Sequence, residues 1–160
     1  LSEVTGKAIT LPSEAQWEKA ASWASSPVGG IEGGKDLKRE YPWGNQWHEG
    51  WCNSLELGLG DTTPVGIFPE GASPYGLLDM AGNVDEWMRS DYRSYPYDPD
   101  DGWEDVDLED ARRVVRGGAF DSDSRSVRCA SRDYYVPYAL LNLVGFRCVA
   151  FLVCSGTLVL

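Results

Sequence analysis

Between residues 78 and 87 the chain reads Leu78-Asp79-Met80-Ala81-Gly82-Asn83-Val84-Asp85-Glu86-Trp87. Apolar and polar residues interchange from Val84 to Met88, a pattern typical of a short, half-buried strand. The residues before Val84 do not continue this pattern and include Gly76 and Gly82. This region therefore predicts a loop that leads into a strand.

One clear helix is predicted from Ser13 onward. Ser13 can cap its N-terminus, and Gln16, three residues later, completes a capping box. We expect the helix to end before Pro27. Its buried face is predicted from apolar residues at helical spacing, which are Trp17, Ala20, Ala21 and Ala24.

Short strands are predicted in the second half of the chain. Residues 114–116 form a strand that enters a Gly-Gly turn, and residues 127–130 and 145–151 alternate and should pair in a sheet. The apolar runs 149–153 and 157–160 predict one or two buried strands. One helix, several short strands and much ordered loop indicate a single α+β domain over residues 1–160. Because Leu1 enters directly into what reads as the end of an element, we expect an N-terminal part to be missing.

Charge and composition exclude several classes of protein. The net charge is −11 and the pI about 4.4, so the surface repels phosphate backbones and nucleic-acid binding is not expected. No apolar run approaches the roughly 20 residues of a membrane span, and no signal segment is evident, which predicts a soluble protein. The four cysteines, Cys52, Cys129, Cys148 and Cys154, permit three pairings, and in a domain of this size we expect free, buried thiols.

The C-terminal part has an unusual composition. Residues 117–160 contain no Lys, Glu, Gln, Met or Trp, although the chain as a whole has 7 Trp and 2 Met. Small, tyrosyl and aliphatic residues follow one another there, and they suit a recognition surface. Tyrosine supplies rigid contact area, and serine and aspartate supply adaptable hydrogen bonds. The segment from about residue 120 to 143 is therefore the predicted ligand-binding segment.

Two clusters in this segment supply the candidate ligand-binding residues. The alternative is that the leucines belong to the core and that the Ser/Asp cluster is an ordinary solvated loop. The first cluster comprises Asp121, Ser122, Asp123, Ser124 and Ser126, and the second comprises Asp133, Tyr134, Tyr135, Tyr138, Ala139, Leu140, Leu141 and Leu143.

Six motifs appear in order along the chain. They begin at Leu11-Pro12-Ser13-Glu14, Tyr41-Pro42-Trp43-Gly44-Asn45, Thr63-Pro64-Val65-Gly66, Leu78-Asp79-Met80-Ala81, Arg113-Val114-Val115-Arg116-Gly117-Gly118 and Gly145-Phe146-Arg147-Cys148. Together they resemble the formylglycine-generating-enzyme (sulfatase-modifying factor) superfamily. The resemblance covers nearly the whole chain. It implies a C-type-lectin-like fold, on which several activities occur, so that fold alone does not choose among them.

Two of the activities on this fold are enzymatic, and this chain lacks the residues that each of them requires. Family oxidases hold copper with two cysteines shortly after the Arg-Gly-Gly motif, and soft thiolates suit Cu(I), but this chain has residues 121–126 without a cysteine at that place. We therefore expect neither copper nor oxidase activity, although a formylglycine-generating oxidase or another enzyme of the superfamily is the alternative. Sulfoxide synthases of the ergothioneine type need three histidines, and the chain has one, His48.

The third activity on this fold is that of the variable protein of a diversity-generating retroelement. Such systems change template AAC codons into NNC codons, a set that cannot encode Lys, Glu, Gln, Met or Trp. These are the five residues absent from the C-terminal part. The resemblance thus implies a non-enzymatic protein that binds a protein or other macromolecule through a diversified surface.

The resemblance also implies a structural calcium site. Two carboxylates with intervening backbone carbonyls can bind this hard cation. The alternative is a loop held by hydrogen bonds alone, with Glu86 in an ion pair. A second calcium position of the family would start at Asn53, but Leu57 stands where its acidic partner belongs. The first set of implied ligands is Asp79, Gly82, Val84 and Glu86.

Overall fold

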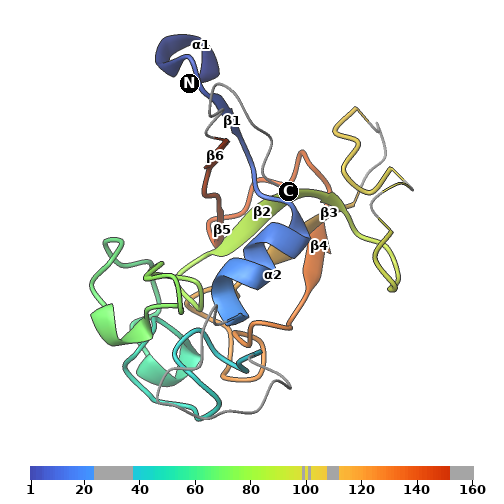
Figure 1. Cartoon of the computed structure of the whole chain (residues 1–160). Coiled ribbons are helices and arrows are strands. Elements are labelled where there is room, and N and C mark those ends of the chain that lie inside the picture. Colours follow the sequence, from blue (N-terminus) through green and yellow to red (C-terminus); the bar gives the residue numbers. More distant parts are fainter. Residues whose placement is uncertain (24–37, 99, 101, 108–111, 152–160) are drawn as a thin grey trace, which may run out of the picture.

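The computed structural model describes residues 1–23, 38–98, 100, 102–107 and 112–151. A four-stranded sheet forms its centre, helix α2 crosses this sheet, and long loops gather at one end (Figure 1). This is the predicted loop-rich α+β architecture. The elements in chain order are α1 (Ser2–Thr5), β1 (Ala8–Thr10), α2 (Glu14–Ser22), the 3-10 helices η1 (Leu55–Leu57) and η2 (Pro69–Gly71), β2 (Asp85–Asp91), β3 (Arg113–Arg116), β4 (Asp133–Tyr135), β5 (Val144–Gly145) and β6 (Val149–Phe151).

Helix α2 begins as its sequence predicts. The Ser13 hydroxyl accepts a hydrogen bond from the Gln16 N–H at 3.1 Å, and the Gln16 side chain accepts one from the Ser13 N–H at 2.9 Å. This reciprocal pair is a complete capping box, which satisfies donors that the first helical turn leaves open. Two of the residues used to predict the helix and its end, Ala24 and Pro27, lie outside the described residues.

The core lies between α2 and one face of the central sheet. Trp17 and Ala21 of the helix are buried and pack with Met88 of β2 and Val114 of β3. These side chains exclude water from that face of the sheet and hold the helix across it. The helix-facing side of the sheet therefore carries this hydrophobic core.

The central sheet has the strand order β4-β3-β2-β5. Strand β3 is antiparallel to both β2 and β4, and β5 is parallel to β2. Val115 lies opposite Trp87 on one side and opposite Asp133 on the other. Because directly paired residues share a face and side chains alternate along a strand, Asp85, Val115, Asp133 and Tyr135 all lie on the face away from α2.

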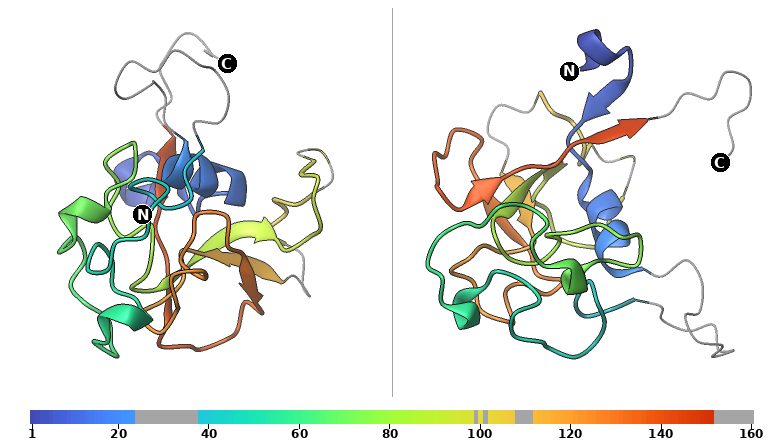
Figure 2. Two further views of the ribbon diagram at one scale, coloured as in Figure 1. Left: turned by 90° about the horizontal axis from the view of Figure 1, so that it is seen from below. Right: turned by 90° about the vertical axis from the view of Figure 1, so that its left-hand side faces the viewer.

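The predicted strand over residues 145–151 is divided into two. Strand β5 pairs with β2, whereas β6 pairs with β1 in a separate two-stranded sheet with Ala8 opposite Phe151. This small sheet lies at the end of the molecule that carries the N-terminus (Figure 2). The predicted continuation over residues 152–160 lies outside the described residues.

The predicted strand over residues 127–130 is wrong. Val127 and Cys129 are fully buried, as the alternation suggested, but they lie in a chain of turns. The Val127 N–H donates to the carbonyl of Asp123 at 3.1 Å, and the Cys129 N–H donates to the carbonyl of Glu40 at 2.8 Å. Loop carbonyls thus take the place of a neighbouring strand.

Candidate functional site

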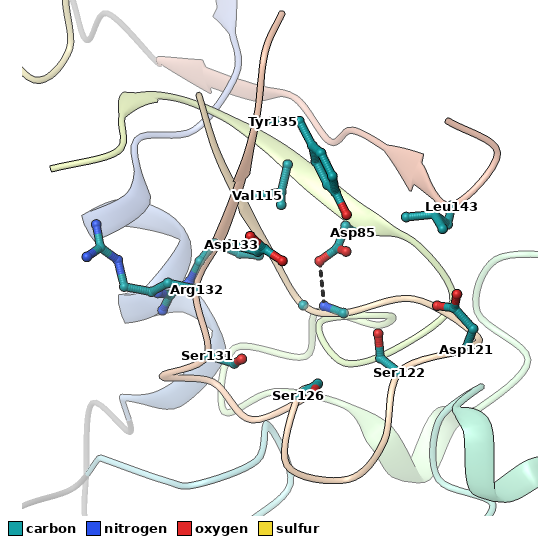
Figure 3. Close-up of a pocket in the computed structure, with 13 residues that line it drawn as sticks. Asp85, Val115, Asp121, Ser122, Ser126, Ser131, Arg132, Asp133, Tyr135 and Leu143 are labelled. Atoms are coloured by element: carbon teal, nitrogen blue, oxygen red, sulfur yellow. Dashed lines mark hydrogen bonds between the residues drawn. The ribbon is translucent and has the colours of Figure 1, made fainter. Parts of the chain in front are cut away.

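A cavity of about 310 Å³ opens on the face of the sheet away from α2 (Figure 3). Strands β2, β3 and β4 supply one wall, and the loop that follows β3 supplies the other. The lining residues are Asp85, Val115, Arg116, Gly117, Gly118, Asp121, Ser122, Ser126, Ser131, Arg132, Asp133, Tyr135 and Leu143.

The cavity brings together residues from both predicted clusters. The first cluster comes from the loop after β3, and the second comes from β4 and the chain that leads to β5. They meet because β4 folds back along β3. The predicted residues that line the cavity are Asp121, Ser122, Ser126, Asp133, Tyr135 and Leu143.

The remaining predicted residues lie outside the cavity. Tyr134 is on the other face of β4, where its ring contacts Tyr92 with 4.7 Å between centroids. Leu140 is 98% exposed and Tyr138 is 80% exposed, so neither belongs to a core. The residues that the cavity does not include are Asp123, Ser124, Tyr134, Tyr138, Ala139, Leu140 and Leu141.

Sequence reasoning missed the innermost carboxylate of the cavity, Asp85. It was recognised only as part of the loop-to-strand motif, yet it is the first residue of β2 and only 9% exposed. Its Oδ1 accepts a hydrogen bond from the Gly118 N–H at 2.9 Å. Gly118 has a φ of 72°, and an added Cβ there would lie 2.9 Å from Val127, so this close approach requires glycine. A carboxylate directly beside Glu86, and therefore on the other face of the strand, was the signal available.

The electrostatics of the cavity are acidic. Burial raises the pKa of the Asp85 carboxyl to about 6, and the nearby charges of Asp133 and Asp121 add to the rise, whereas the Gly118 hydrogen bond opposes it. Burial also raises the pKa of the Tyr135 phenol, and the same three carboxylates contribute. Tyr135 is therefore a neutral phenol at physiological pH and can both donate and accept a hydrogen bond.

Two arginines line the cavity, but acidic residues of α2 neutralise them. The Arg116 guanidinium, which is fully buried, donates to Glu14 at 2.9 Å and to Glu18 at 2.6 Å. Arg132 binds both oxygens of Glu14, at 2.5 and 2.7 Å. Glu18 has a lowered pKa although burial acts against it, because Lys38 and Arg116 stabilise its charge. These pairs join the sheet to the helix, and among the residues that line the cavity they leave the carboxylates without a compensating cation.

The predicted calcium ligands are held by the protein itself. Glu86 accepts two hydrogen bonds from Arg147, both at 2.5 Å, and a third from the Trp17 indole N–H at 2.7 Å. Asp79 accepts the Gly66 N–H at 2.7 Å, and the Gly82 carbonyl accepts the Val84 N–H at 3.0 Å. The part of the chain that the structure describes contains no group of three or more His, Cys, Asp or Glu arranged for a metal.

This arrangement favours the alternative in which hydrogen bonds hold the loop and Glu86 forms an ion pair. Both carboxylate oxygens of Glu86 already have strong donors, so the loop does not fit a calcium cage as it lies. Calcium binding stays a prediction. A rise in the melting temperature when Ca²⁺ is added to chelator-treated protein would support it.

Three of the four cysteines lie within the described residues, and all three are free thiols. Cys52 and Cys129 are buried free thiols, and Cys148 is exposed. Burial raises the pKa of both Cys52 and Cys129 to about 12, so each is a weakly reactive thiol at physiological pH. None of the three lines the cavity. Cys154 lies outside the described residues.

The fold and the site define a loop-rich C-type-lectin-like domain with an acidic cavity beside its central sheet. Residues 2–152 match the sulfatase-modifying factor enzyme 1-like domain, and the chain therefore belongs to this family. None of the helices in the described ranges has the length and apolar character needed to cross a membrane.

Similar proteins on this fold have diverse names. The chain is 40% identical over 142 residues to the serine/threonine-protein kinase Pkn1 of Chlamydia trachomatis, a match that covers 86% of this chain and 20% of that protein. It is 30% identical to the inactive C-alpha-formylglycine-generating enzyme 2 of Bos taurus, covering 88% of this chain and 43% of that protein. The chain thus spans less than half the length of these relatives.

Among solved structures, Treponema denticola variable protein 1 superposes with a TM-score of 0.65 at 26% identity. The match covers 89% of this chain and 47% of that one. Proteins whose names denote a kinase, an inactive enzyme and a variable protein therefore share this domain. Membership of the family does not by itself decide between enzyme and binding protein.

Proposed function

We propose that this domain is a non-enzymatic ligand-binding protein whose surface over residues 120–143 is diversified by a retroelement. One observation carries the proposal: the cavity is lined from both predicted clusters, within the part of the chain that lacks Lys, Glu, Gln, Met and Trp. The ligand is a protein or another macromolecule, bound without turnover. The similarity to a variable protein supports this class of function.

The way the loop after β3 is held supports the proposal. Main-chain hydrogen bonds fix its course, because the Ser122 carbonyl accepts the Leu55 N–H at 3.0 Å and the Cys129 N–H bonds to Glu40. The Tyr41 hydroxyl donates to the Ser124 carbonyl at 3.1 Å. These bonds use the backbone of the loop, and the Ser122 and Asp123 side chains add one hydrogen bond each, to the Ala119 and Ser126 N–H groups. Such a loop can change its side chains without losing its shape, which lowers the ordering cost of binding.

A randomised library tests this scaffold directly. Codons for residues 121, 122, 126, 133, 135 and 143 would be replaced by NNC and the proteins displayed on yeast, with a matched library at the buried positions Ala119, Val127 and Cys129 as control. We expect most cavity variants to fold and some to bind unrelated target proteins, while the control library largely unfolds. Equal loss of folding in both libraries would contradict the proposal.

The DNA that follows the gene tests the origin of the diversity. We expect a near-copy of the region encoding Arg116 to Arg147, differing where the copy has adenine, beside a reverse transcriptase gene. Absence of such a copy would remove the retroelement from the proposal.

The alternative function, an oxidase of the formylglycine-generating type, has its own test. The protein would be loaded with Cu(I) and incubated with oxygen and a sulfatase peptide that contains cysteine. Because residues 121–126 contain no cysteine and neither Cys52 nor Cys129 lines the cavity, we expect no aldehyde product. Detected turnover would overturn the proposed function.

A further inference from the structure

The cavity has an unusual balance of charge for a space enclosed by protein. Asp85, Asp121 and Asp133 all line it. The two arginines in its wall are bound to Glu14 and Glu18, so the charge of these arginines is already offset. The net charge that a ligand meets in the cavity is therefore negative.

Asp85 is largely buried and only partly paired. The residue is only 9% exposed, and within the described residues only its Oδ1 has a hydrogen-bond donor, the Gly118 N–H. Figure 3 shows the carboxylate of Asp85 among the side chains that line the cavity, with one oxygen in a hydrogen bond to the backbone. The second oxygen is open to the cavity, and because the residue as a whole is largely buried this carboxylate is incompletely hydrated. A charged donor brought by a ligand would therefore form a stronger hydrogen bond there than at a fully exposed carboxylate.

The shape of the cavity limits the size of the group that enters. Its volume of about 310 Å³ is at the lower end of the range of roughly 300–1,000 Å³ for small-molecule sites, which suits a single side chain. The Tyr135 ring forms part of the wall and is held by an edge contact with Trp87, with 6.1 Å between centroids. Figure 3 shows its hydroxyl oxygen beside Asp85. An aromatic wall next to carboxylates favours a cation with an apolar stem.

We propose that this cavity binds an organic cation, a guanidinium or ammonium group, between Asp85, Asp133 and Tyr135. The inference rests on the proposed function and names the chemistry of its ligand. Arginine and lysine side chains of a protein partner carry this group, and so do free diamines. In either case the cation donates to the free oxygen of Asp85 and lies against the Tyr135 ring.

The test uses small probes and nuclear magnetic resonance of the backbone amides. The probes are N-acetyl-arginine amide, N-acetyl-lysine amide, putrescine, and N-acetyl-citrulline amide, which is the neutral counterpart of the arginine probe. We expect the cationic probes to shift the amide signals of Gly117, Gly118 and Tyr135 and to bind at least about tenfold more tightly than the citrulline probe. Tighter binding of the amino-acid amides than of putrescine assigns the site to a protein side chain, and the reverse order assigns it to a free diamine.

Two variants and a matched control complete the test. Asp85→Asn and Asp133→Asn should each weaken binding of the arginine probe at least about tenfold. Asp107→Asn removes the same charge from an exposed residue outside the cavity and should leave binding unchanged. Equal binding of the arginine and citrulline probes, or unchanged binding in both cavity variants, would overturn the inference.

Failure of this inference can be separated from failure of the proposed function. If the NNC library yields protein binders but the probes show no preference for charge, the scaffold function stands and the cation site does not. If the probes bind as expected but the library unfolds and no template copy exists, the cation site stands without diversification.

Discussion

Two neighbouring carboxylates on strand β2, Asp85 and Glu86, differ in how many hydrogen-bond donors they have. Glu86 points to the helix-facing side of the sheet, where Arg147 and Trp17 satisfy both of its oxygens. Asp85 points to the other side, where it has one backbone donor and a cavity. Both residues are buried, at 5% and 9% exposure, so burial alone does not separate them. The difference lies in how completely each charge is paired.

This difference distinguishes a carboxylate that stabilises the fold from one that can bind a ligand. A buried charge that is fully paired ties elements together, and removing one partner leaves the other uncompensated. A buried charge that is only partly paired costs stability, and residues of this kind cluster at functional sites. The helix-facing side therefore holds the fold, and the cavity side is where a ligand can gain binding energy.

The largest loss of stability is expected from Arg116→Met. This change removes the buried guanidinium that Glu14 and Glu18 share, and leaves Glu14 paired with Arg132 alone and Glu18 paired with Lys38 alone. We expect the free energy of unfolding to fall by about 3–5 kcal/mol, as measured by denaturant unfolding. Arg128→Met serves as the control, because Arg128 is half exposed and 3.8 Å from Glu40, and it should cost less than about 0.5 kcal/mol. Equal losses would mean that the buried network does not hold the sheet to α2.

A smaller loss is expected from Glu86→Gln. The amide can still accept from Trp17, but it cannot pair with the Arg147 charge, which is partly exposed. The free energy of unfolding should fall by about 2–3 kcal/mol, measured by thermal or urea unfolding at neutral pH. A neutral or stabilising effect would place Glu86 in the same class as Asp85 and remove the contrast between the two faces.

Ser122→Ala probes the loop that forms one wall of the cavity. The Ser122 hydroxyl accepts the Ala119 N–H at 3.0 Å, so its removal should cost about 1 kcal/mol. Hydrogen exchange of the Ala119 amide, which should become faster, would report the lost bond. A loss as large as that of Arg116→Met would show that this loop carries the fold and cannot be freely diversified.

The smallest effects are expected at Tyr138→Ser and Leu140→Ser. Both side chains are largely exposed, so each change should alter the free energy of unfolding by less than about 0.5 kcal/mol. Differential scanning calorimetry would measure this. If Leu140→Ser lowered the free energy of unfolding by more than about 1 kcal/mol, Leu140 would belong to the core, as in the alternative interpretation of the sequence.

Local rules were enough to predict part of this fold. The capping box at Ser13 and Gln16 and the apolar spacing of Trp17 and Ala21 specify α2 within one short segment. The strand over Val114 to Arg116 was predictable for the same reason. The alternation at Val127 and Cys129 predicted their burial but gave the wrong structure, because a buried loop can repeat the pattern of a strand when distant carbonyls accept its N–H groups.

The cavity could not be predicted from the sequence, because it forms only in the tertiary structure. Both predicted clusters were evident from composition, but their meeting depends on β4 pairing with β3, which the sequence does not state. Asp85 could not be ranked above Glu86, since two adjacent carboxylates in a strand reveal their difference only when the faces are known. The seven predicted residues outside the cavity are similar in residue type to those that line it, but their side chains lie elsewhere.

The central claim is that Asp85 is kept for binding at a cost in stability, and the pH dependence of Asp85→Asn tests it most directly. The folded-state pKa of about 6 lies above the ordinary value of 3.8, so between these values the native state holds a proton that the unfolded state has released. The contribution of Asp85 to the unfolding free energy should therefore fall as the pH rises through this window.

The measurement is the difference in unfolding free energy between Asp85→Asn and the natural protein, from urea titrations between pH 3 and 7. We predict that the variant gains on the natural protein as the pH rises from about 4 to about 6, by up to about 3 kcal/mol, since one pKa unit corresponds to about 1.4 kcal/mol. The gain should shrink when N-acetyl-arginine amide is present. A difference that stays flat, or that increasingly favours the natural protein as the pH rises, would contradict the account, because Asp85 would then be a satisfied structural carboxylate like Glu86.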